Sequence, residues 1–464
     1  MILETYYLDC LAQASYLIIS EGEALVIDPQ RDIKIYLEAA KKHNAKIKYV
    51  FETHHHADFV SGHLEFAKVH DATIFMGKEA KADFNFVGVA DGSVLRFGKA
   101  KVEFRETPGH TLESVCAVLF DLEKDAKNPE AVFTGDTLFI GDVGRPDLLG
   151  ATISKEELAT MLYNSLQTKL LVLPNETKVY PGHGAGSMCG KALSNDKVST
   201  IGREKDTNYA LQAKSKEEFI SLVATNQPIA PKYFPLDVQI NRKGAQPLQN
   251  VIGNLRPFST QEVVLLQNRG AKILDVRSHK DFSQNAIPSS INVGLDGSFA
   301  TWAGCVFGEN DKVIIVAQEG KEAEVATRLS RIGLDIAVGY LAGGIESWEG
   351  EMEPKPRLAP KDLESILENP NFQFVDIRGV GEFQTERIEN FKNFPLNNLS
   401  DSVANLSKDK EIILMCRSSY RSSVARTFLE NLGFKKVTDV EGGILACQED
   451  GLKIVTEECS MSKV

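Results

Sequence analysis

Long apolar runs, a paired set of cysteines and an excess of basic charge are all missing from this 464-residue sequence. No stretch approaches the ~20 consecutive apolar residues that a membrane-spanning helix needs, which argues against a membrane protein. The seven cysteines are odd in number and widely scattered, so no disulfide framework is expected. A formal net charge of -12 excludes the basic face that binding to nucleic acid demands.

The N-terminus and the composition favour a soluble protein of several domains. Residues 1–9 contain no basic region followed by a long apolar core, so a secretory signal peptide is not expected. Hydrophobic residues make up 43% of the chain and charged residues 25%, as is typical of globular proteins. At roughly 150 residues per domain, the length predicts about three domains. We therefore expect a cytoplasmic protein with reduced thiols.

Short strands, turns and helices alternate along the first half of the chain. Apolar segments predict strands at Ile47 to Phe51, Lys101 to Arg105, Val115 to Phe120 and Ala131 to Phe133. Helices are expected at Ile33 to His43, Lys155 to Leu166 and Thr207 to Ala213. The stretch from Gln227 to Pro257, rich in Pro, Asn, Gln and Gly, is predicted to connect two domains.

The second half contains an internal repeat. Residues 273–277 (ILDVR) recur as 374–378 (FVDIR), and 341–345 (LAGGI) recur as 440–444 (VEGGI). A period of about 100 residues indicates a duplicated domain and not a solenoid array. Each copy alternates strands and helices, which favours a parallel α/β sheet. We predict domains at 1–245, 246–353 and 354–464, with a proline-rich hinge before the second copy.

Four turns in the first half carry potential metal ligands. These are His54, His56 and Asp58 in one loop, then His110, Asp136 and His183 in three separate turns. Ligands in turns at strand ends can be held rigidly by a sheet. Their spacing in the first loop requires an extended or turn backbone, because residues i and i+2 face apart on a helix. Phe59 stands where a two-metal version of the pattern would carry another histidine.

The sequence of blocks T-H-x-H-x-D, P-G-H-T, T-G-D-T and P-G-H-G resembles the metallo-β-lactamase superfamily over roughly the first 190 residues. The resemblance implies an αββα sandwich. Binuclear hydrolases of that superfamily fill a second metal site using a histidine at the position of Phe59, which cannot coordinate a metal. The chain is therefore more similar to the persulfide dioxygenase branch, which uses a single Fe(II).

That resemblance implies one Fe(II) per chain, held by His54, His110 and Asp136. Two imidazoles and one carboxylate leave three coordination positions open, as oxygen activation requires. The remaining candidates would orient the ligands and bind water: His56, Asp58 and His183.

Two further residues near these blocks have alternative interpretations. Arg145 lies in a G-R-x-D segment that resembles the persulfide dioxygenases, and it could either pair with Asp147 or meet an anionic thiol substrate through its forked donors. Cys189 follows His183 closely and could be an inert buried thiol or a thiol that accepts sulfane sulfur near the iron.

A cysteine near the end of the chain is predicted to be reactive. Cys416 follows an apolar strand and precedes a helix, so backbone N–H groups and the helix dipole favour its thiolate. Arg417 and Arg421 add positive charge. Between these two arginines the loop comprises Ser418, Ser419 and Tyr420. Its backbone amides would stabilise a persulfide anion on the cysteine.

The segment from Leu358 to about Ile454 resembles a rhodanese domain, through its D-I-R and E-G-G-I motifs and this loop. Four residues separate the cysteine from the second arginine, one fewer than in related phosphatases, which favours sulfur over phosphate. The matching loop of the first copy, residues 316–321, has no cysteine and adds Glu319, so that copy is expected to be inert.

These resemblances together predict an enzyme of sulfide detoxification. A low-molecular-weight thiol persulfide and O₂ would react at the iron to give sulfite, and Cys416 would pass sulfane sulfur to sulfite to form thiosulfate. The resemblance also implies a homo-oligomer. Two alternatives stay open: a zinc thioester hydrolase of glyoxalase II type with regulatory rhodanese modules, and a persulfide sensor or carrier without significant turnover.

Overall fold

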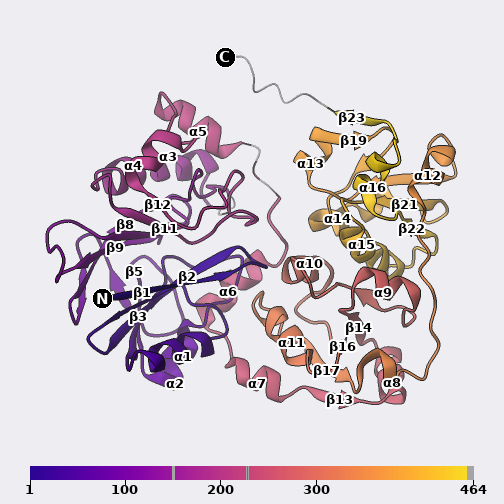
Figure 1. Cartoon of the computed structure of the whole chain (residues 1–464), viewed down its shortest axis with the longest axis horizontal. Coiled ribbons are helices and arrows are strands. Elements are labelled where there is room, and N and C mark those ends of the chain that lie inside the picture. The colour runs from indigo at the N-terminus through magenta and orange to yellow at the C-terminus, as the bar shows by residue number, and fades with distance from the viewer. Residues whose placement is uncertain (149–151, 226, 228, 457–464) are drawn as a thin grey trace. The chain divides into compact units, whose positions relative to one another are not determined.

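The computed structural model describes residues 1–148, 152–225, 227 and 229–456. The chain divides into two compact units, one ending at residue 248 and the other beginning at 249 (Figure 1). Within the described residues, no helix has both the length and the apolar character required to cross a membrane.

The first unit contains two six-stranded sheets. One sheet has the order β1 (Ile2–Leu8), β2 (Gln13–Ser20), β3 (Glu23–Ile27), β4 (Lys46–Phe51), β5 (Thr73–Gly77) and β6 (Val87–Val89). The other has the order β12 (Ser199–Thr200), β11 (Lys178–Pro181), β10 (Ala131–Gly135), β9 (Val115–Asp121), β8 (Ala100–Glu106) and β7 (Val94–Phe97). In the first of these sheets β1–β2 and β2–β3 pair antiparallel, and β3–β4, β4–β5 and β5–β6 pair parallel. In the second, β10–β11 is parallel and the other neighbouring pairs are antiparallel, so each sheet is mixed.

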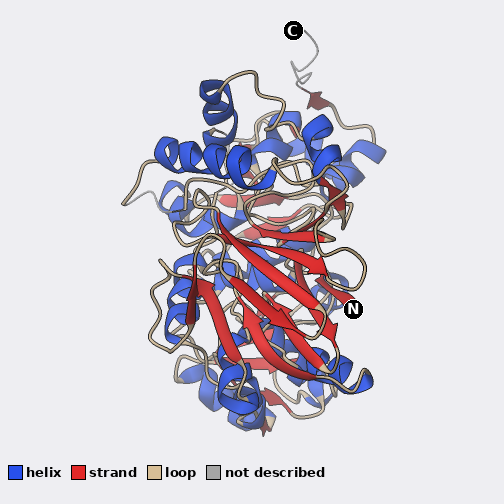
Figure 2. Ribbon diagram, turned by 90° about the vertical axis from the view of Figure 1, so that its left-hand side faces the viewer, coloured by secondary structure: helices blue, strands red, loops and turns tan. Residues whose placement is uncertain are grey.

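Helices cover the outer faces of both sheets, with the strands between them in Figure 2. The helices of this unit are α1 (Lys34–Lys42), α2 (His63–His70), α3 (Lys155–Ser165) with its π-helical continuation (Leu166–Leu170), α4 (Ile201–Thr207), α5 (Lys216–Ala224) and α6 (Phe234–Lys243). The core between the sheets includes Phe51, Phe104 and Phe133, while α1 and α3 each seal a separate outer core. This arrangement is the αββα sandwich that the resemblance implied.

Continuous apolar strands explain why both faces of each sheet are covered. Every residue of β9 is buried, and its sequence VCAVLFD has no polar alternation before the final aspartate. A strand that packs against a sheet on one side and a helix on the other needs apolar side chains on both faces. The sites described below lie where such strands end, in loops held by this core.

The second unit contains two parallel sheets that belong to the two copies of the repeat. The first has the order β13 (Arg256–Phe258), β17 (Ala337–Leu341), β16 (Val313–Val316), β14 (Lys272–Asp275) and β15 (Ile291–Asn292). The second has the order β20 (Lys392–Asn393), β18 (Phe372–Asp376), β21 (Glu411–Met415) and β22 (Val437–Asp439). A separate antiparallel pair joins β19 (Glu386–Ile388) to β23 (Ile454–Thr456). The prediction of a parallel α/β sheet in each copy is confirmed.

Helices pack on these sheets through apolar faces. In the first copy they are α8 (Thr260–Asn268), α9 (His279–Gln284), α10 (Phe299–Val306) and α11 (Glu322–Ser330), while α7 (Leu248–Gly253) precedes it. In the second copy they are α12 (Pro360–Leu363), α13 (Val380–Thr385), α14 (Leu399–Ser402), α15 (Tyr420–Asn431) and α16 (Gly443–Glu449). Gly333 and Gly433 follow α11 and α15 with φ of 70° and 85°. Glycine adopts this left-handed conformation at the end of a helix without the strain that a side chain would cause.

Two sequence-based predictions for the first half differ from the structure. The helix expected at Thr207 to Ala213 is wrong, because α4 ends at Thr207 and turns follow it. The side chain of Asn208 accepts from the N–H of Ala210 and donates to the carbonyl of Asp142, which fixes a turn in place of a helix. The stretch predicted as a connection contains α6, which packs against the loop that follows β4.

Candidate functional site

The loop after β4 is shaped by one buried carboxylate. Asp28, which follows β3, accepts hydrogen bonds from the backbone N–H of Thr53 at 2.8 Å and from its hydroxyl at 2.9 Å. It also lies 2.9 Å from Nε2 of His56. Because β3 and β4 are parallel neighbours, their ends bring Asp28 and this loop to the same edge of the sheet. Asp28 therefore fixes the backbone that presents His54 and turns His56 toward itself.

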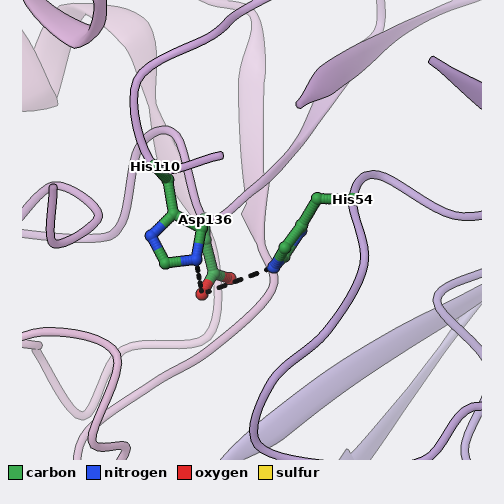
Figure 3. Close-up of side chains that lie close together, drawn as sticks. All are labelled: His54, His110 and Asp136. Carbon is green, nitrogen blue, oxygen red and sulfur yellow. Dashed lines mark ion pairs between the residues drawn. The ribbon is translucent and has the colours of Figure 1, made fainter. Parts of the chain in front are cut away.

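Three predicted ligands converge from three different loops. Oδ2 of Asp136 lies 3.9 Å from Nε2 of His54 and 3.5 Å from Nε2 of His110 (Figure 3). His54 follows β4, His110 lies between β8 and β9, and Asp136 follows β10. All three side chains are buried, and their ligand atoms lie within 4.8 Å of one another. This geometry suits one small metal ion.

Hydrogen bonds direct the correct nitrogen of each histidine into the cluster. Nδ1 of His54 lies 3.0 Å from the hydroxyl of Thr53, and Nδ1 of His110 donates to the carbonyl of Arg145 at 2.9 Å. Both rings therefore face Asp136 with Nε2, whose lone pair is free for a metal when Nδ1 carries the proton. Burial and four neighbouring histidines hold the pKa of His54 well below its usual value, so its ring is neutral.

The carboxylate of Asp136 has no hydrogen-bond partner for either oxygen among the described residues, although the side chain is buried. Such a group is costly to bury unless a cation satisfies it. Two neutral imidazoles and one unsatisfied carboxylate therefore fit a divalent metal ion, and the 2-His-1-carboxylate set fits Fe(II).

Glycines beside these ligands allow the loops to approach closely. A Cβ atom on Gly135 would come within 2.4 Å of the Thr53 hydroxyl, and the residue has φ of 47°. A Cβ on Gly109 would come within 2.4 Å of the Cα of Leu162 in α3. The glycines that precede Asp136 and His110 are thus required by packing, which explains the T-G-D and P-G-H blocks.

A second group of donors lies on the other side of Asp136. Nε2 of His183 is 3.3 Å from Oδ2 of Asp58 and 3.6 Å from Oδ1 of Asp136. The ligand atoms of His56, Asp58 and His183 lie within 4.8 Å of one another, and all three side chains are buried. Neither ring nitrogen of His183 has a hydrogen-bond partner among the described residues. Their predicted role in orienting ligands and water stays a prediction.

Phe59 and Asp28 both contact the ring of His56. The ring of Phe59 packs on that of His56 with centroids 4.3 Å apart. Although burial lowers the pKa of His56, the charge and hydrogen bond of Asp28 outweigh it and raise the pKa to about 9. A histidine that is protonated beside a carboxylate is a poor metal ligand. The side chain of Phe59 has no atom that could coordinate a metal.

Each nitrogen of the Arg145 guanidinium donates a hydrogen bond to the protein. Nε and Nη2 donate to the carboxylate of Asp147 at 2.6 and 2.8 Å, and Nη1 donates to the carbonyl of Met188 at 2.9 Å. The backbone N–H of Arg145 also donates to the carbonyl of Cys189. These contacts favour the loop-fixing interpretation of Arg145, and the substrate-binding role stays a prediction.

Cys189 reaches the metal cluster from the loop that Arg145 holds. Its Sγ lies within 4.8 Å of ligand atoms of Asp136 and His183, and the side chain is buried. Burial first, and then the charges of Asp58 and Asp136, raise the pKa of the thiol well above its ordinary value. A thiol this close to the cluster and this well buried is shielded from solvent oxidants.

Asn241 in α6 supports the loop after β4, and the sequence analysis missed it. Its Nδ2 donates to the carbonyls of His56 at 2.9 Å and Phe59 at 2.8 Å, and its Oδ1 accepts from the N–H of Ser61. Asn241 is buried and distant in sequence, within a stretch whose composition indicated a connection. No local pattern marked it.

A second candidate site lies at the end of β21 in the other unit. Cys416 is buried at 1% exposure, and its Sγ lies 3.4 Å from the hydroxyl of Ser422 in α15. Ser419, with φ of 76°, precedes α15, and its hydroxyl accepts from the N–H of Gly442 at 2.8 Å. This left-handed residue wraps the loop around the sulfur, so the cysteine lies at the N-terminal end of α15 as predicted.

The charged residues of this loop have unequal surroundings. Arg417 and Ser418 are exposed, whereas the guanidinium of Arg421 makes a two-point pair with Glu382 at 2.6 and 2.7 Å. Arg417 is therefore the cation available at the mouth of the loop. Tyr420 begins α15 and donates its hydroxyl to the carbonyl of Gly294 at 2.6 Å.

The first copy has alanine at the position of Cys416. A Cβ on Gly344 would lie 2.5 Å from the carbonyl oxygen of Ala317, just as one on Gly443 would lie 2.4 Å from that of Cys416. These matching contacts identify Ala317 as the counterpart of the reactive cysteine. Without a thiol in this position, the first copy cannot carry a persulfide there.

Comparison with known proteins identifies both halves of the chain. Residues 8–183 match the model of the metallo-beta-lactamase superfamily, and residues 259–351 and 359–450 match the model of the rhodanese-like domain. A metallo-beta-lactamase structure from Staphylococcus aureus subsp. aureus COL is 31% identical with a TM-score of 0.66, over 73% of this chain and 98% of that one.

Two named relatives of the first half differ in activity. The cytoplasmic hydroxyacylglutathione hydrolase of Arabidopsis thaliana is 36% identical over 39% of this chain and 67% of its own length. The mitochondrial persulfide dioxygenase ETHE1 of Mus musculus is 29% identical over 48% of this chain and 79% of its own length. The predicted order of domain types, one sandwich followed by two copies of a sulfurtransferase-like fold, is confirmed.

Proposed function

Because the chain belongs to the metallo-β-lactamase superfamily and carries two rhodanese-like domains, we propose that it oxidises a low-molecular-weight thiol persulfide to sulfite and then forms thiosulfate. The carrying observation is the presence on one chain of a buried 2-His-1-carboxylate cluster, with Phe59 beside it, and of the Cys416 loop. One site suits oxygen chemistry on sulfur, and the other suits transfer of sulfur.

His54, His110 and Asp136 would hold one Fe(II). When bound, Fe(II) supplies the activation of O₂, for which this ligand set leaves three open positions. The protein fixes Nε2 of His110 through the carbonyl of Arg145 and that of His54 through Thr53. His183 and Asp58, with unpaired polar atoms beside Asp136, would orient the water that the reaction consumes.

The first reaction balances without an added reductant. A persulfide R–S–SH, O₂ and one water give the thiol R–SH and sulfurous acid, which ionises to sulfite. Both atoms of O₂ join the terminal sulfur, and the S–S bond breaks. The departing sulfur leaves as a thiolate and takes up a proton, while water supplies the third oxygen of sulfite. The mouse relative bears the name of this activity, which supports the proposal for the first unit.

The second reaction is a transfer of sulfane sulfur through Cys416. Its thiolate would attack the terminal sulfur of a second persulfide, breaking the S–S bond and releasing the thiol. The loop amides of residues 417–420 would stabilise the resulting persulfide anion. Sulfite would then attack the outer sulfur, releasing thiosulfate and restoring the thiolate of Cys416. No net oxidation occurs in this step.

Product analysis of Cys416→Ser tests the assignment of the two sites. Glutathione persulfide or coenzyme A persulfide is supplied with O₂, and sulfite, thiosulfate and O₂ uptake are followed together. We expect O₂ uptake at the wild-type rate with sulfite accumulating in place of thiosulfate. Cys305→Ser, which removes a thiol from the first copy, is the matched control. Thiosulfate formation by Cys416→Ser at the wild-type rate would overturn the second reaction.

A zinc thioester hydrolase is the second candidate for the first unit. The Arabidopsis thaliana relative favours it, as do Asp58 and His183, which lie beside Asp136. That hydrolase would contain stoichiometric zinc and cleave a glutathione thioester without consuming O₂. Metal analysis and O₂ uptake on the same sample separate the two candidates. A homo-oligomeric state and a cytoplasmic location stay predictions.

A further inference from the structure

The first copy, which has Ala317 in place of the reactive cysteine, contacts the reactive loop of the second copy directly. Tyr420, which follows the loop, donates its hydroxyl to the carbonyl of Gly294, just after β15 of the first copy. A Cβ atom on Gly294 would lie 3.0 Å from the Tyr420 ring, so the ring packs closely against this backbone. The N-terminus of α15 is thereby anchored outside its own domain.

Asn292 extends this anchor along α15. Its Oδ1 accepts from the hydroxyl of Ser423 at 2.8 Å, and its backbone N–H donates to the hydroxyl of Thr427 at 3.1 Å. Its Nδ2 donates to the carbonyls of Asp275 and Arg277, which binds it to β14 of its own copy. All of these bonds are buried or partly buried. Asn292 therefore links the sheet of the first copy to the helix that supports Cys416.

The equivalent residue of the second copy makes only the inner half of this pattern. Asn393 donates from Nδ2 to the carbonyls of Asp376 and Arg378, matching the inner bonds of Asn292. Both copies therefore share the inner hydrogen bonds of this asparagine, and in the first copy Asn292 also binds α15 of the second copy. The first copy keeps this contact although it has no thiol at the position of Cys416.

Trp302 from α10 of the first copy lies over the arginine of the reactive loop. The centre of the Arg421 guanidinium is 5.9 Å from the centroid of the indole ring, within the range of a cation–π contact. The same guanidinium is bound at two points by Glu382 of its own copy. Arg421 is therefore held from two sides, by a carboxylate of one copy and a ring of the other.

We propose that Trp302 is a positioning residue for sulfur transfer at Cys416, and that the first copy, which has Ala317 in place of the reactive cysteine, completes the binding site for an anionic sulfur donor. This inference rests on the proposed sulfur transfer. Trp302 holds the Arg421–Glu382 ion pair in place, so this pair forms a fixed and nearly neutral rim of the Cys416 loop. The exposed Arg417 is then the cation that meets the anionic sulfur donor. Loss of the ring would release the pair, and Glu382 could then oppose an incoming anion.

Steady-state kinetics of the full chain test this role with thiosulfate as donor and cyanide as acceptor. The Cys416 thiolate attacks the outer sulfur of thiosulfate and releases sulfite, and cyanide then removes that sulfur as thiocyanate. For Trp302→Ala we expect a roughly fivefold to tenfold higher KM for thiosulfate, the size of a partly buried cation–π contact, with kcat changed less than twofold. Trp302→Phe should recover most of the loss because a ring remains.

Trp348→Ala is the matched control, since Trp348 is the only other tryptophan of the chain and donates to the carbonyl of Glu351 within its own copy. Its KM should equal that of the wild type. Equal KM values in the folded Trp302→Ala and Trp348→Ala proteins would overturn the inference. Equal loss in Trp302→Ala and Trp302→Phe would also overturn it.

Fluorescence supplies a readout that a merely structural role would not move. In Trp348→Phe, Trp302 is the sole tryptophan, so its emission should change when thiosulfate loads Cys416 and should return when cyanide unloads it. An unchanged emission in an active protein would overturn the inference. A wild-type protein that transfers no sulfur from thiosulfate would instead overturn the sulfur-transfer function on which the inference rests.

Discussion

The backbone carbonyl of Arg145 accepts a hydrogen bond from Nδ1 of His110 at 2.9 Å, and this bond decides which ring nitrogen faces Asp136. The side chain of the same arginine secures the loop that carries Cys189 through Asp147 and Met188. One residue thus couples the orientation of His110 to the position of the Cys189 thiol, which lies beside Asp136 and His183.

Substitution of Arg145 by lysine should weaken this coupling. Lysine keeps the backbone carbonyl and the charge but cannot reproduce the two-point contact with Asp147 and the bond to Met188. We expect bound metal close to the wild-type amount, with persulfide-dependent O₂ uptake lowered roughly tenfold. Metal analysis and oxygen-electrode measurements check both parts. An unchanged rate would show that the fork of Arg145 has no part in catalysis.

Asp28→Asn should lower metal affinity without removing a ligand. Asp28 accepts from Thr53 at two atoms and pairs with His56, and an amide can accept with only one of its two groups. We expect metal affinity to fall by about 10- to 100-fold, as for other groups that orient ligands. Titration of the metal-free protein with Fe(II) under anaerobic conditions measures it. Asp125→Asn, on an exposed loop, is the control, and equal affinity in both variants would contradict the role.

Phe59→His should create a second metal site. Asp58, His183 and Asp136 already lie close together with unpaired polar atoms, and a histidine at position 59 would add a fourth donor where phenylalanine has none. When the metal-free protein is reconstituted with zinc, we expect one zinc per chain in the wild type and two in the variant. Phe59→Leu, which adds no donor, should stay at one. A stoichiometry of one in Phe59→His would show that the loop cannot turn a ring at position 59 toward His183.

Acid should weaken the second unit through His279. Burial, followed by the charges of Arg357 and Lys280, lowers the pKa of His279 to about 4, although Asp281 acts in the opposite direction. Because the folded-state pKa is lower than the unfolded value near 6.5, this stabilisation is complete above pH 6.5 and is lost as pH falls toward 4. The protonated ring would lie against Arg357, whose Nη1 is 3.0 Å from Nδ1.

His279→Gln should therefore lose part of this acid sensitivity. Thermal unfolding followed from pH 7 to pH 4 should show a smaller fall in melting temperature for the variant than for the wild type. His70→Gln, in the other unit, serves as the control and should follow the wild type. Parallel curves for the wild type and His279→Gln would contradict the assignment.

The proximity of His54, His110 and Asp136 could be anticipated from the sequence because each follows a strand of the same sandwich. His54 and Asp136 follow β4 and β10, whose ends are held by continuous apolar strands, so their convergence follows from the topology. The strand–loop–helix setting of Cys416 was equally visible, since a strand, a short loop and an amphipathic helix are local patterns. The position of a residue that directly follows a strand can be inferred once that strand is recognised in the sequence.

Contacts between distant segments could not be predicted in the same way. Asn241 is 185 residues from His56 in sequence, and Trp302 is more than a hundred residues from Arg421, so no spacing rule connects either pair. The pairing of Arg421 with Glu382 also escaped, because a charged residue on a helix indicates only a solvated face. The helix predicted at Thr207 to Ala213 was wrong for a different reason. There, one hydrogen bond from the N–H of Ala210 to the side chain of Asn208 outweighed the local helix propensity.

The hydrogen bonds of Asn241 set a lower limit on the size of an independently working first unit. The segment matching the superfamily ends at residue 183, yet the loop bearing His54 is closed by a side chain from α6. A fragment cut at the end of that match would keep every proposed iron ligand and lose the support of their loop. Truncations meant to isolate the oxidative activity should therefore retain α6 to Lys243 and place the cut beyond it.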